Sequence, residues 1–348
     1  MNAATAAPNK FLQTLGGAVQ AIPPIWLMRQ AGRYLPEYRQ IRATAPSFLD
    51  FCYTPRQATE ATLQPIRRFG FDAAIVFSDI LVVPDALGQT VSFESGEGPR
   101  LKPIESHADF DGLRDQLDFA RLAPVFETLE RVRASLPDEV ALIGFCGAPW
   151  TVASYMIAGR GTPDQAPARL FAYQNQRLFG ELIALLVEAS ADYLIRQLRA
   201  GAQAVQIFDS WSGVLPAAEL ERWCLAPLAA IVAKVRAEAP DAPIIAFPRG
   251  AGAALTKFAA VEGVAALGLD TTVDPASAAA TLPVGLASQG NLDPLALVAG
   301  GDSLDEAVDR ILAGFSDRPH IFNLGHGILP ETPIAHVERL VYRVRRAR

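Results

Sequence analysis

The chain has 348 residues, and its 31 lysines and arginines against 37 aspartates and glutamates give a formal net charge of −6. Half of the residues are hydrophobic and 20% are charged, which excludes intrinsic disorder. The mild acidic excess disfavours nucleic acid and anionic membranes as partners. Three scattered cysteines, Cys52, Cys146 and Cys224, fit neither a disulfide framework nor a Cys-x-x-Cys metal site. They suit a reducing compartment, so we expect a cytoplasmic protein.

The beginning of the chain differs in composition from the rest. Residues 1–10 are polar and alanine-rich, without the apolar segment of a secretory signal, and predict a flexible N-terminal extension. No stretch approaches the roughly 18 uninterrupted apolar residues of a membrane span. Residues 11–348 contain no long linker or internal repeat, and we expect them to form a single catalytic domain.

Eight short apolar runs recur along the chain, most of them separated by segments of helical periodicity. Their continuous hydrophobicity indicates strands that are buried on both faces, as in a parallel sheet. The alternation predicts a (β/α)₈ TIM barrel, with an open doubly wound sheet as the alternative. The helical pattern is clearest in Leu178–Leu198, Ala217–Ala237 and Pro333–Arg348. The predicted strands are Pro24–Met28, Ala73–Phe77, Ala141–Phe145, Ala204–Phe208, Pro243–Phe247, Ala265–Leu269, Pro283–Ala287 and His320–Leu324.

Polar or titratable residues follow the predicted strands. In a barrel the carboxyl ends of the strands converge on one mouth, where active sites lie. Each of these residues could instead cap the next helix, but Arg29 and His326 are poor caps. The exits read Arg29, Ser78-Asp79, Cys146-Gly147, Asp209-Ser210, Pro248-Arg249, Asp270-Thr271, Gln289-Gly290-Asn291 and Gly325-His326.

Arginine dominates the cationic residues, of which only four are lysines. Compositional bias of a GC-rich genome explains most of this excess, and carboxylate recognition is the alternative. Arg29, Arg33, Arg39 and Arg42 fall within fourteen residues. Guanidinium groups bind carboxylates through paired hydrogen bonds, so this segment predicts an anion site rather than a solvated basic loop.

Two further residues stand out by their position. Asp79 lies between apolar runs, where a carboxylate needs a partner, either a ligand or one of the arginines. Cys146 follows a strand without an evident base nearby, so we interpret it as a buried apolar residue rather than a nucleophile. No His-Glu-x-x-His or His-x-Cys spacing occurs, and we expect no metal.

Four sequence blocks resemble uroporphyrinogen decarboxylase of haem biosynthesis. The similarity extends from about Phe11 to the C-terminal helix. It implies a homodimeric barrel that converts the four acetate side chains of uroporphyrinogen III to methyl groups, giving coproporphyrinogen III and CO₂ without a cofactor or metal. The blocks are WLMRQAGRYLPEY (Trp26–Tyr38), FSDIL (Phe77–Leu81), GFCGAPWTVASYM (Gly144–Met156) and NLGHG (Asn323–Gly327).

The resemblance also implies the roles of individual residues. Asp79 and Arg29 are the expected catalytic residues, and the proton donor is either Arg29, directly or through a water, or His326. Some relatives read Glu-Ser-His where this chain reads Asp209-Ser210-Trp211, which leaves the role of that neighbouring position open. The expected substrate-binding residues are Met28, Arg33, Arg42, Tyr155, Phe208, Ser210 and His326.

Two other functions compete with this interpretation. Zinc-dependent corrinoid or thiol methyltransferases share the barrel superfamily, but they need a His-x-Cys pair, whereas Gly327 and Ile328 follow His326 here. A tetrapyrrole carrier with an inactive barrel is the second alternative. The joint presence of Arg29, Asp79 and Tyr155 disfavours it.

Overall fold

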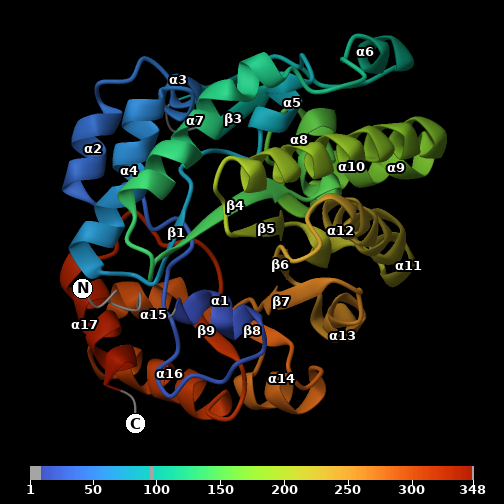
Figure 1. Cartoon of the computed structure of the whole chain (residues 1–348). Helices are drawn as coiled ribbons and strands as arrows, with labels where there is room; N and C mark the ends of the chain where they lie inside the picture. Colours follow the sequence, from blue (N-terminus) through green and yellow to red (C-terminus); the bar gives the residue numbers. More distant parts are fainter. Residues whose placement is uncertain (1–8, 95–97, 347–348) are drawn as a thin grey trace.

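A parallel sheet of seven strands forms the centre of the protein. The computed structural model describes residues 9–94 and 98–346, and in it the sheet curls while the helices lie around its outside (Figure 1). The strand order follows the chain order, unlike that of a doubly wound sheet. The strands are, in order, β1 (Ala73–Ile75), β4 (Ala141–Gly147), β5 (Ala204–Asp209), β6 (Ile244–Pro248), β7 (Val264–Gly268), β8 (Ala287–Leu292) and β9 (His320–Leu324).

The strand predicted over Pro24–Met28 is reduced to a single parallel bridge between Ile25 and Phe322 of β9. On its other side, the carbonyl oxygen of Ile25 accepts a hydrogen bond from the N–H of Asp72 at 2.9 Å, directly before β1. Side-chain oxygens accept hydrogen bonds from backbone N–H groups that would bind a neighbouring strand in a regular sheet. The side-chain oxygen of Gln30 accepts from the N–H of Leu27. That of Asn323 accepts from the N–H of Met28.

The strand predicted over Pro283–Ala287 is wrong. Residues 283–286 form a turn in which Val284 is 93% exposed, and β8 begins only at Ala287. The predicted strand exit at Gln289-Gly290-Asn291 therefore lies inside the strand. These polar side chains are buried because they have partners, for example the indole N–H of Trp26, which donates to Oε1 of Gln289 at 3.0 Å.

Helices alternate with the strands, as predicted, but one of them is interrupted. The helix expected over Ala217–Ala237 divides into α11 (Ala217–Leu220), a π-helical turn η3 (Glu221–Leu225) and α12 (Ala226–Glu238). The expected helix at Leu178–Leu198 is α10 (Gln176–Arg199), and the closing helix is α17 (Ile334–Arg345).

The remaining elements complete the outer layer. In the part of the chain before β5, these are α1 (Lys10–Leu15), α2 (Pro36–Arg42), α3 (Phe48–Cys52), α4 (Pro55–Phe69), α5 (Val82–Ala86), α6 (His107–Asp111), α7 (Phe119–Ser135), α8 (Pro149–Ala158), η1 (Pro163–Gln165) and α9 (Ala166–Gln174). After β5 follow η2 (Ser212–Val214), η4 (Gly252–Ala254), α13 (Leu255–Ala259), α14 (Pro275–Thr281), α15 (Pro294–Ala299) and α16 (Gly301–Gly314). An antiparallel hairpin of β2 (Val91–Glu94) and β3 (Gly98–Leu101), which the sequence did not predict, lies outside the sheet.

The N-terminal extension predicted for residues 1–10 lies mostly outside the described residues, of which Asn9 caps α1 and Lys10 begins it. In the described ranges, no helix is both long and apolar enough to cross a membrane.

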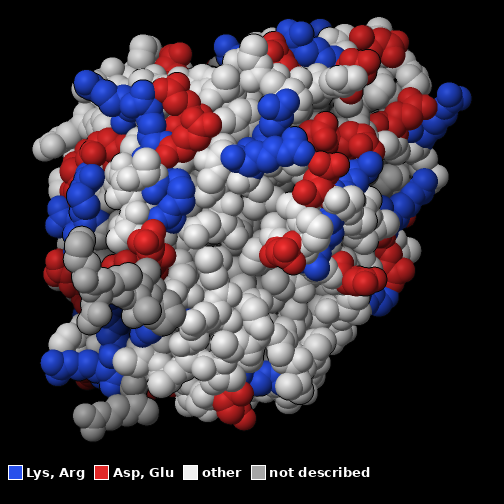
Figure 2. Space-filling view, in the orientation of Figure 1, with Lys and Arg blue, Asp and Glu red and all other residues white. Residues whose placement is uncertain are grey.

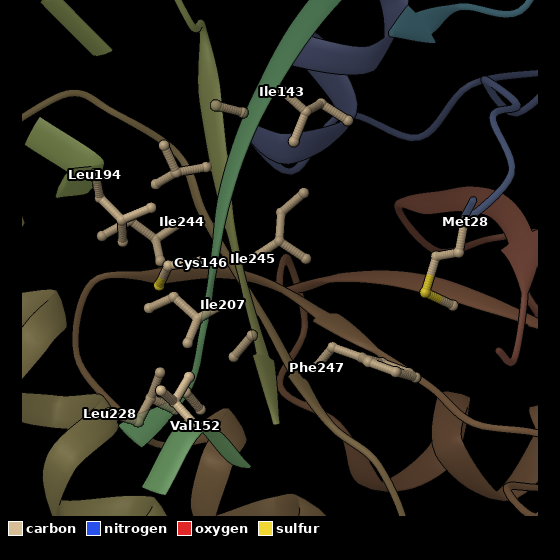
Figure 3. Close-up of a cluster of buried hydrophobic side chains, with 14 of the residues drawn as sticks. Met28, Ile143, Cys146, Val152, Leu194, Ile207, Leu228, Ile244, Ile245 and Phe247 are labelled. Carbon is tan, nitrogen blue, oxygen red and sulfur yellow. The ribbon is translucent and has the colours of Figure 1, made fainter. Parts of the chain in front are cut away.

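Aliphatic and aromatic side chains fill the space between the sheet and the helices. Cys146 of β4 lies among Leu194, Ile207 and Ile244 (Figure 3). Burial raises the pKa of the Cys146 thiol to about 12, so the thiol remains protonated and acts as a small apolar group.

On the outside, positive and negative side chains intermingle over the face shown in Figure 2. No extended area of one sign covers the described part of that face. The net charge is therefore a weak guide to the ligand.

Candidate active site

Arg29 leaves the Pro24–Met28 segment in a left-handed backbone conformation with φ of 62°. Gly32 leaves room for this conformation, because a Cβ there would lie 2.9 Å from the carbonyl oxygen of Arg29. A Cβ on Gly327 would lie 2.3 Å from Cδ of Arg29, so the side chain passes directly over the NLGHG segment. The guanidinium group is exposed at the carboxyl-terminal mouth of the sheet, meaning the edge formed by the residues that follow the strands.

Asp79 follows β1 and is partly buried at the same mouth. Its Oδ1 accepts a hydrogen bond from the N–H of Leu81 at 2.8 Å, which fixes the direction of the carboxylate. Burial raises the pKa of Asp79, whereas the Leu81 hydrogen bond and the charge of Arg29 lower it. Arg29 and Asp79 therefore lie close enough to influence each other, although they form no ion pair within 4 Å.

Tyr155 of α8 and His326, which follows β9, belong to the same group. Burial raises the pKa of Tyr155, and the charges of Asp79 and Arg29 act on it in opposite directions. Burial, followed by the charges of Arg29 and Arg249, lowers the pKa of His326 to about 4. The imidazole is thus uncharged at neutral pH. The structure brings together four residues from distant parts of the sequence: Arg29, Asp79, Tyr155 and His326.

The end of β5 contributes Phe208 and Ser210. The ring of Phe208 is partly exposed and packs edge-on against Phe145 at 5.7 Å and Phe247 at 6.0 Å, measured between ring centroids. Ser210 is also partly exposed. Met28 is almost completely buried, and the Phe247 side chain extends toward it (Figure 3).

A buried hydrogen-bond bridge fixes the segment that contains Ser210. The Thr151 hydroxyl donates to Oδ1 of Asp209 at 2.6 Å, and the N–H of Trp211 donates to the same hydroxyl at 3.3 Å. Burial raises the pKa of Asp209 to about 6. The Trp211 indole N–H is buried, and its hydrogen bonding to Tyr155 lowers the pKa of that side chain. Trp211 therefore lies beside Tyr155 at the mouth.

Arg33 and Arg42 lie around Tyr38, somewhat apart from this group. Burial raises the pKa of Tyr38 to about 12, and the two guanidinium groups lower it. The Tyr38 ring packs edge-on against Phe77, two residues before Asp79, at 5.6 Å. Arg42 donates to the carbonyl oxygen of Ala45 at 3.0 Å, whereas Arg33 is exposed and has no ion pair in the described chain.

Two supporting residues were not among the predicted site residues. Asn323 accepts hydrogen bonds from the N–H groups of Met28 at 2.9 Å and of Leu324 at 2.7 Å, and so fixes the segment before Arg29. Asp270 accepts from the N–H of Gly250 at 2.6 Å and from Thr272. Asn323 stands within a motif block and Asp270 at a strand exit, so position could have indicated both.

Across residues 9–94 and 98–346, no group of three or more His, Cys, Asp or Glu side chains could hold a metal ion. That part of the chain therefore contains no set of zinc ligands of the kind that a zinc-dependent methyltransferase needs.

Solved structures similar to this one support the fold. A methyltransferase from Methanosarcina mazei superposes with a TM-score of 0.80 at 18% identity, covering 96% of this chain and 97% of the other. A B12-independent methionine synthase from Shewanella sp. W3-18-1 superposes with a TM-score of 0.56 at 10% identity, covering 95% and 96%. At such identities the likeness concerns the fold alone.

Sequence comparisons identify the family. A model of the family described as Uroporphyrinogen decarboxylase (URO-D) matches residues 7–347. The uroporphyrinogen decarboxylase of Chelativorans sp. (strain BNC1) is 58% identical over 342 residues, covering 98% of this chain and 99% of the relative. That of Mesorhizobium japonicum is 60% identical over 337 residues, covering 97% and 98%. The chain belongs to the uroporphyrinogen decarboxylase family.

Proposed function

We propose that this chain removes the carboxylates of the four acetate side chains of uroporphyrinogen III and so produces coproporphyrinogen III and CO₂. The observation that carries the proposal is the meeting of Arg29, Asp79, Tyr155 and His326 at one mouth. Each of them matches a position that the resemblance to the family implies for the active site. The tetrapyrrole with eight carboxylates accounts for the arginines, and its four pyrrole N–H donors account for a central carboxylate.

The chemistry needs an electron sink and a stabilised cation. Protonation of a pyrrole carbon beside the acetate-bearing carbon gives an iminium-like ring. The C–C bond to the carboxylate then breaks, its electron pair neutralises the ring, and CO₂ leaves. Protonation of the exocyclic methylene yields the methyl group. Loss of the proton first added to the ring carbon then restores the pyrrole, so that one proton is consumed overall for each CO₂ released. Asp79, in its ionised form, stabilises the ring cation, and a partly buried site strengthens this effect.

The proton donor in this proposal is Arg29 or a water that Arg29 orients. His326 is the alternative, because imidazolium is an easier donor than guanidinium. The pKa of about 4 leaves His326 uncharged at neutral pH, which favours a role in contacting a substrate carboxylate. Arg33, Arg42, Tyr155 and Ser210 bind further carboxylates, while Phe208 and Met28 pack against the macrocycle.

The finer architecture is part of the same proposal. The hydrogen bonds of Ile25 to both β9 and the residue before β1 support a closed (β/α)₈ barrel, with Pro24–Met28 as its eighth strand. We propose a single catalytic domain over residues 11–348 with an N-terminal extension over residues 1–10. We also propose that it acts as a homodimer, without cofactor or metal. The three unpaired cysteines support a cytoplasmic location.

Anaerobic incubation with uroporphyrinogen III, followed by separation of the products, tests the activity. Stepwise appearance of the hepta-, hexa-, penta- and tetracarboxylate products is expected, and unchanged substrate after long incubation would refute the decarboxylase. The Asp79→Asn variant keeps the size of the side chain and removes its charge. Its kcat should fall by about 10²-fold with a smaller change in KM. The exposed Asp111→Asn serves as the control, and a normal kcat in Asp79→Asn would restrict Asp79 to a structural role.

A further inference from the structure

Arg249 lies at the mouth directly beside Ser210. Strands β5 and β6 are parallel neighbours, and their last residues, Asp209 and Pro248, pair with each other. Ser210 and Arg249 directly follow these two strands and therefore lie side by side. The N–H of Arg249 donates to the carbonyl oxygen of Asp209 at 3.0 Å. The arginine therefore lies on the same edge as the residues of the active site, between the ends of β5 and β7.

The backbone around Arg249 is fixed from both sides. Its carbonyl oxygen accepts from the Ser212 hydroxyl at 2.8 Å and from the N–H of Gly213 at 3.0 Å. The next residue, Gly250, donates to Oδ2 of Asp270 at 2.6 Å. Gly213 and Gly250 are in such close contact that a Cβ on Gly213 would lie 2.6 Å from the Gly250 carbonyl oxygen. The loop thus holds the Arg249 backbone rigidly, as in sites that bind a ligand in one geometry.

The Arg249 guanidinium group has no anionic partner in the described chain. The side chain is partly buried, and neither an ion pair nor a side-chain hydrogen bond holds it among residues 9–94 and 98–346. It lies near His326, whose pKa it lowers together with Arg29. The charge of Asp270 also acts on His326, but this carboxylate accepts from Gly250 and Thr272 and forms no ion pair with Arg249. A partly desolvated cation without an ion pair favours the binding of an anion. The neutral imidazole of His326 can supply one more N–H donor.

We propose that Arg249 binds one carboxylate arm of the tetrapyrrole, which Ser210 and His326 contact on either side. This inference rests on the proposed function and adds a substrate-binding residue on the β6 side of the mouth. A guanidinium group binds a carboxylate through two parallel hydrogen bonds. The arm is either an acetate, which is lost in the reaction, or a propionate, which is kept.

Steady-state kinetics of Arg249→Gln with uroporphyrinogen III test the proposal. We expect KM to rise about 10- to 100-fold, since a charge-assisted contact is lost, while kcat stays within about threefold. Arg249→Lys keeps the charge but loses the paired N–H donors of the guanidinium group, so its KM should rise less. Arg310→Gln, on the exposed face of α16, is the matched control and should behave as the unaltered protein.

The results separate this inference from the proposed function. Turnover of uroporphyrinogen III by the unaltered protein tests the proposed function. The KM of the Arg249 variant relative to that of the unaltered protein tests the role of Arg249. An unchanged KM in a folded Arg249→Gln protein would overturn the inference, and so would a fall in kcat alone. If Arg249→Gln does not fold, Arg249→Lys is compared with the unaltered protein. An unchanged KM in Arg249→Lys would then overturn the inference.

Equilibrium binding of coproporphyrinogen III, which keeps only the propionates, identifies the arm. An equal loss in Arg249→Gln of affinity for this product and for uroporphyrinogen III, taken for the latter from its KM, would assign Arg249 to a propionate. A loss for uroporphyrinogen III alone would assign it to an acetate. Unaltered affinity for both compounds would refute the contact.

Discussion

At the scale of single residues, two glycines leave the room that the backbone and side chain of Arg29 occupy. Arg29 has a positive φ, which is uncommon for a residue with a side chain. Gly32 leaves room for its carbonyl oxygen, and Gly327 leaves room for its aliphatic stem. The two glycines are 295 positions apart in the sequence, which alone did not indicate that their motif blocks touch. The two blocks lie close together because β9 packs beside the Pro24–Met28 segment.

The Gly327→Ala variant tests this contact. The new Cβ would lie 2.3 Å from Cδ of Arg29, so the arginine side chain must move. We expect kcat/KM for uroporphyrinogen III to fall by about 10- to 100-fold, because small displacements of catalytic groups are costly. The backbone of Gly327 does not have a positive φ, so the melting temperature should change little.

Gly180→Ala is the matched control for this variant. Nothing lies within 4 Å of a Cβ at Gly180, which is inside α10. Alanine favours a helix by up to about 1 kcal/mol over glycine, so this variant should be fully active and slightly more stable. Full activity of Gly327→Ala would contradict the proposed position of Arg29.

At the scale of elements, apolar runs predicted most strands but failed where the interior is polar. His320–Leu324 agrees with β9 at both ends, because its residues are buried among apolar neighbours. The strand β8 contains buried Ser288, Gln289 and Asn291, whose partners come from distant segments. Hydropathy cannot reveal such partners, so the apolar pattern favours the turn before Ala287 over the strand that follows it. The candidate site follows from a different rule, since parallel strands bring their exits to one edge, and the roles of its residues stay predictions.

The polar interior leads to a prediction about Gln289. Its Oε1 accepts from the indole N–H of Trp26 at 3.0 Å, and its Nε2 donates to Oε1 of Gln206 at 3.1 Å. The Gln289→Met substitution preserves the shape but leaves buried Trp26 without an acceptor. We expect the free energy of unfolding to fall by about 1–3 kcal/mol, measured by urea denaturation.

A double-mutant cycle isolates the Trp26–Gln289 contact. The double variant Trp26→Phe, Gln289→Met removes both partners, so its loss should be smaller than the sum of the single losses by about 0.5–3 kcal/mol. Gln174→Met, on the exposed side of α9, should stay within about 0.5 kcal/mol of the unaltered protein. Strict additivity in the cycle would show that the two side chains do not interact in solution.

At the scale of the whole molecule, the arginines differ in their surroundings. Many arginines form ion pairs on the surface, such as Arg339 and Arg343 of α17 with Asp305 of α16, both at 2.9 Å. Exposed pairs of this kind contribute little to stability. Arg29, Arg33 and Arg249 have no ion pair in the described part of the chain, and all three follow the ends of strands or strand-like segments. Composition alone indicated the excess, but only the fold separates the arginines available to a polyanionic substrate.

Buried titratable groups make the stability of the whole fold depend on pH. Burial lowers the pKa of His320 to about 3, while its Nδ1 lies 2.8 Å from the Ser288 hydroxyl. The unfolded chain, with an ordinary histidine pKa near 6.5, binds this proton more readily than the folded protein. Stability should therefore fall as the pH drops below about 6.5, by up to about 1.4 kcal/mol per pH unit. His326 acts in the same direction, whereas Asp209, whose pKa is raised to about 6, acts in the opposite one.

His320→Gln isolates the first of these contributions. At pH 7 the variant should be less stable than the unaltered protein by about 1–3 kcal/mol, because it disturbs buried packing. The difference should shrink between pH 6.5 and pH 4, since only the unaltered protein must keep His320 uncharged on folding. Urea denaturation at fixed protein concentration and several pH values measures it, with the exposed His107→Gln as control. Parallel stability curves for His320→Gln and the unaltered protein would show that His320 does not cause the acid sensitivity.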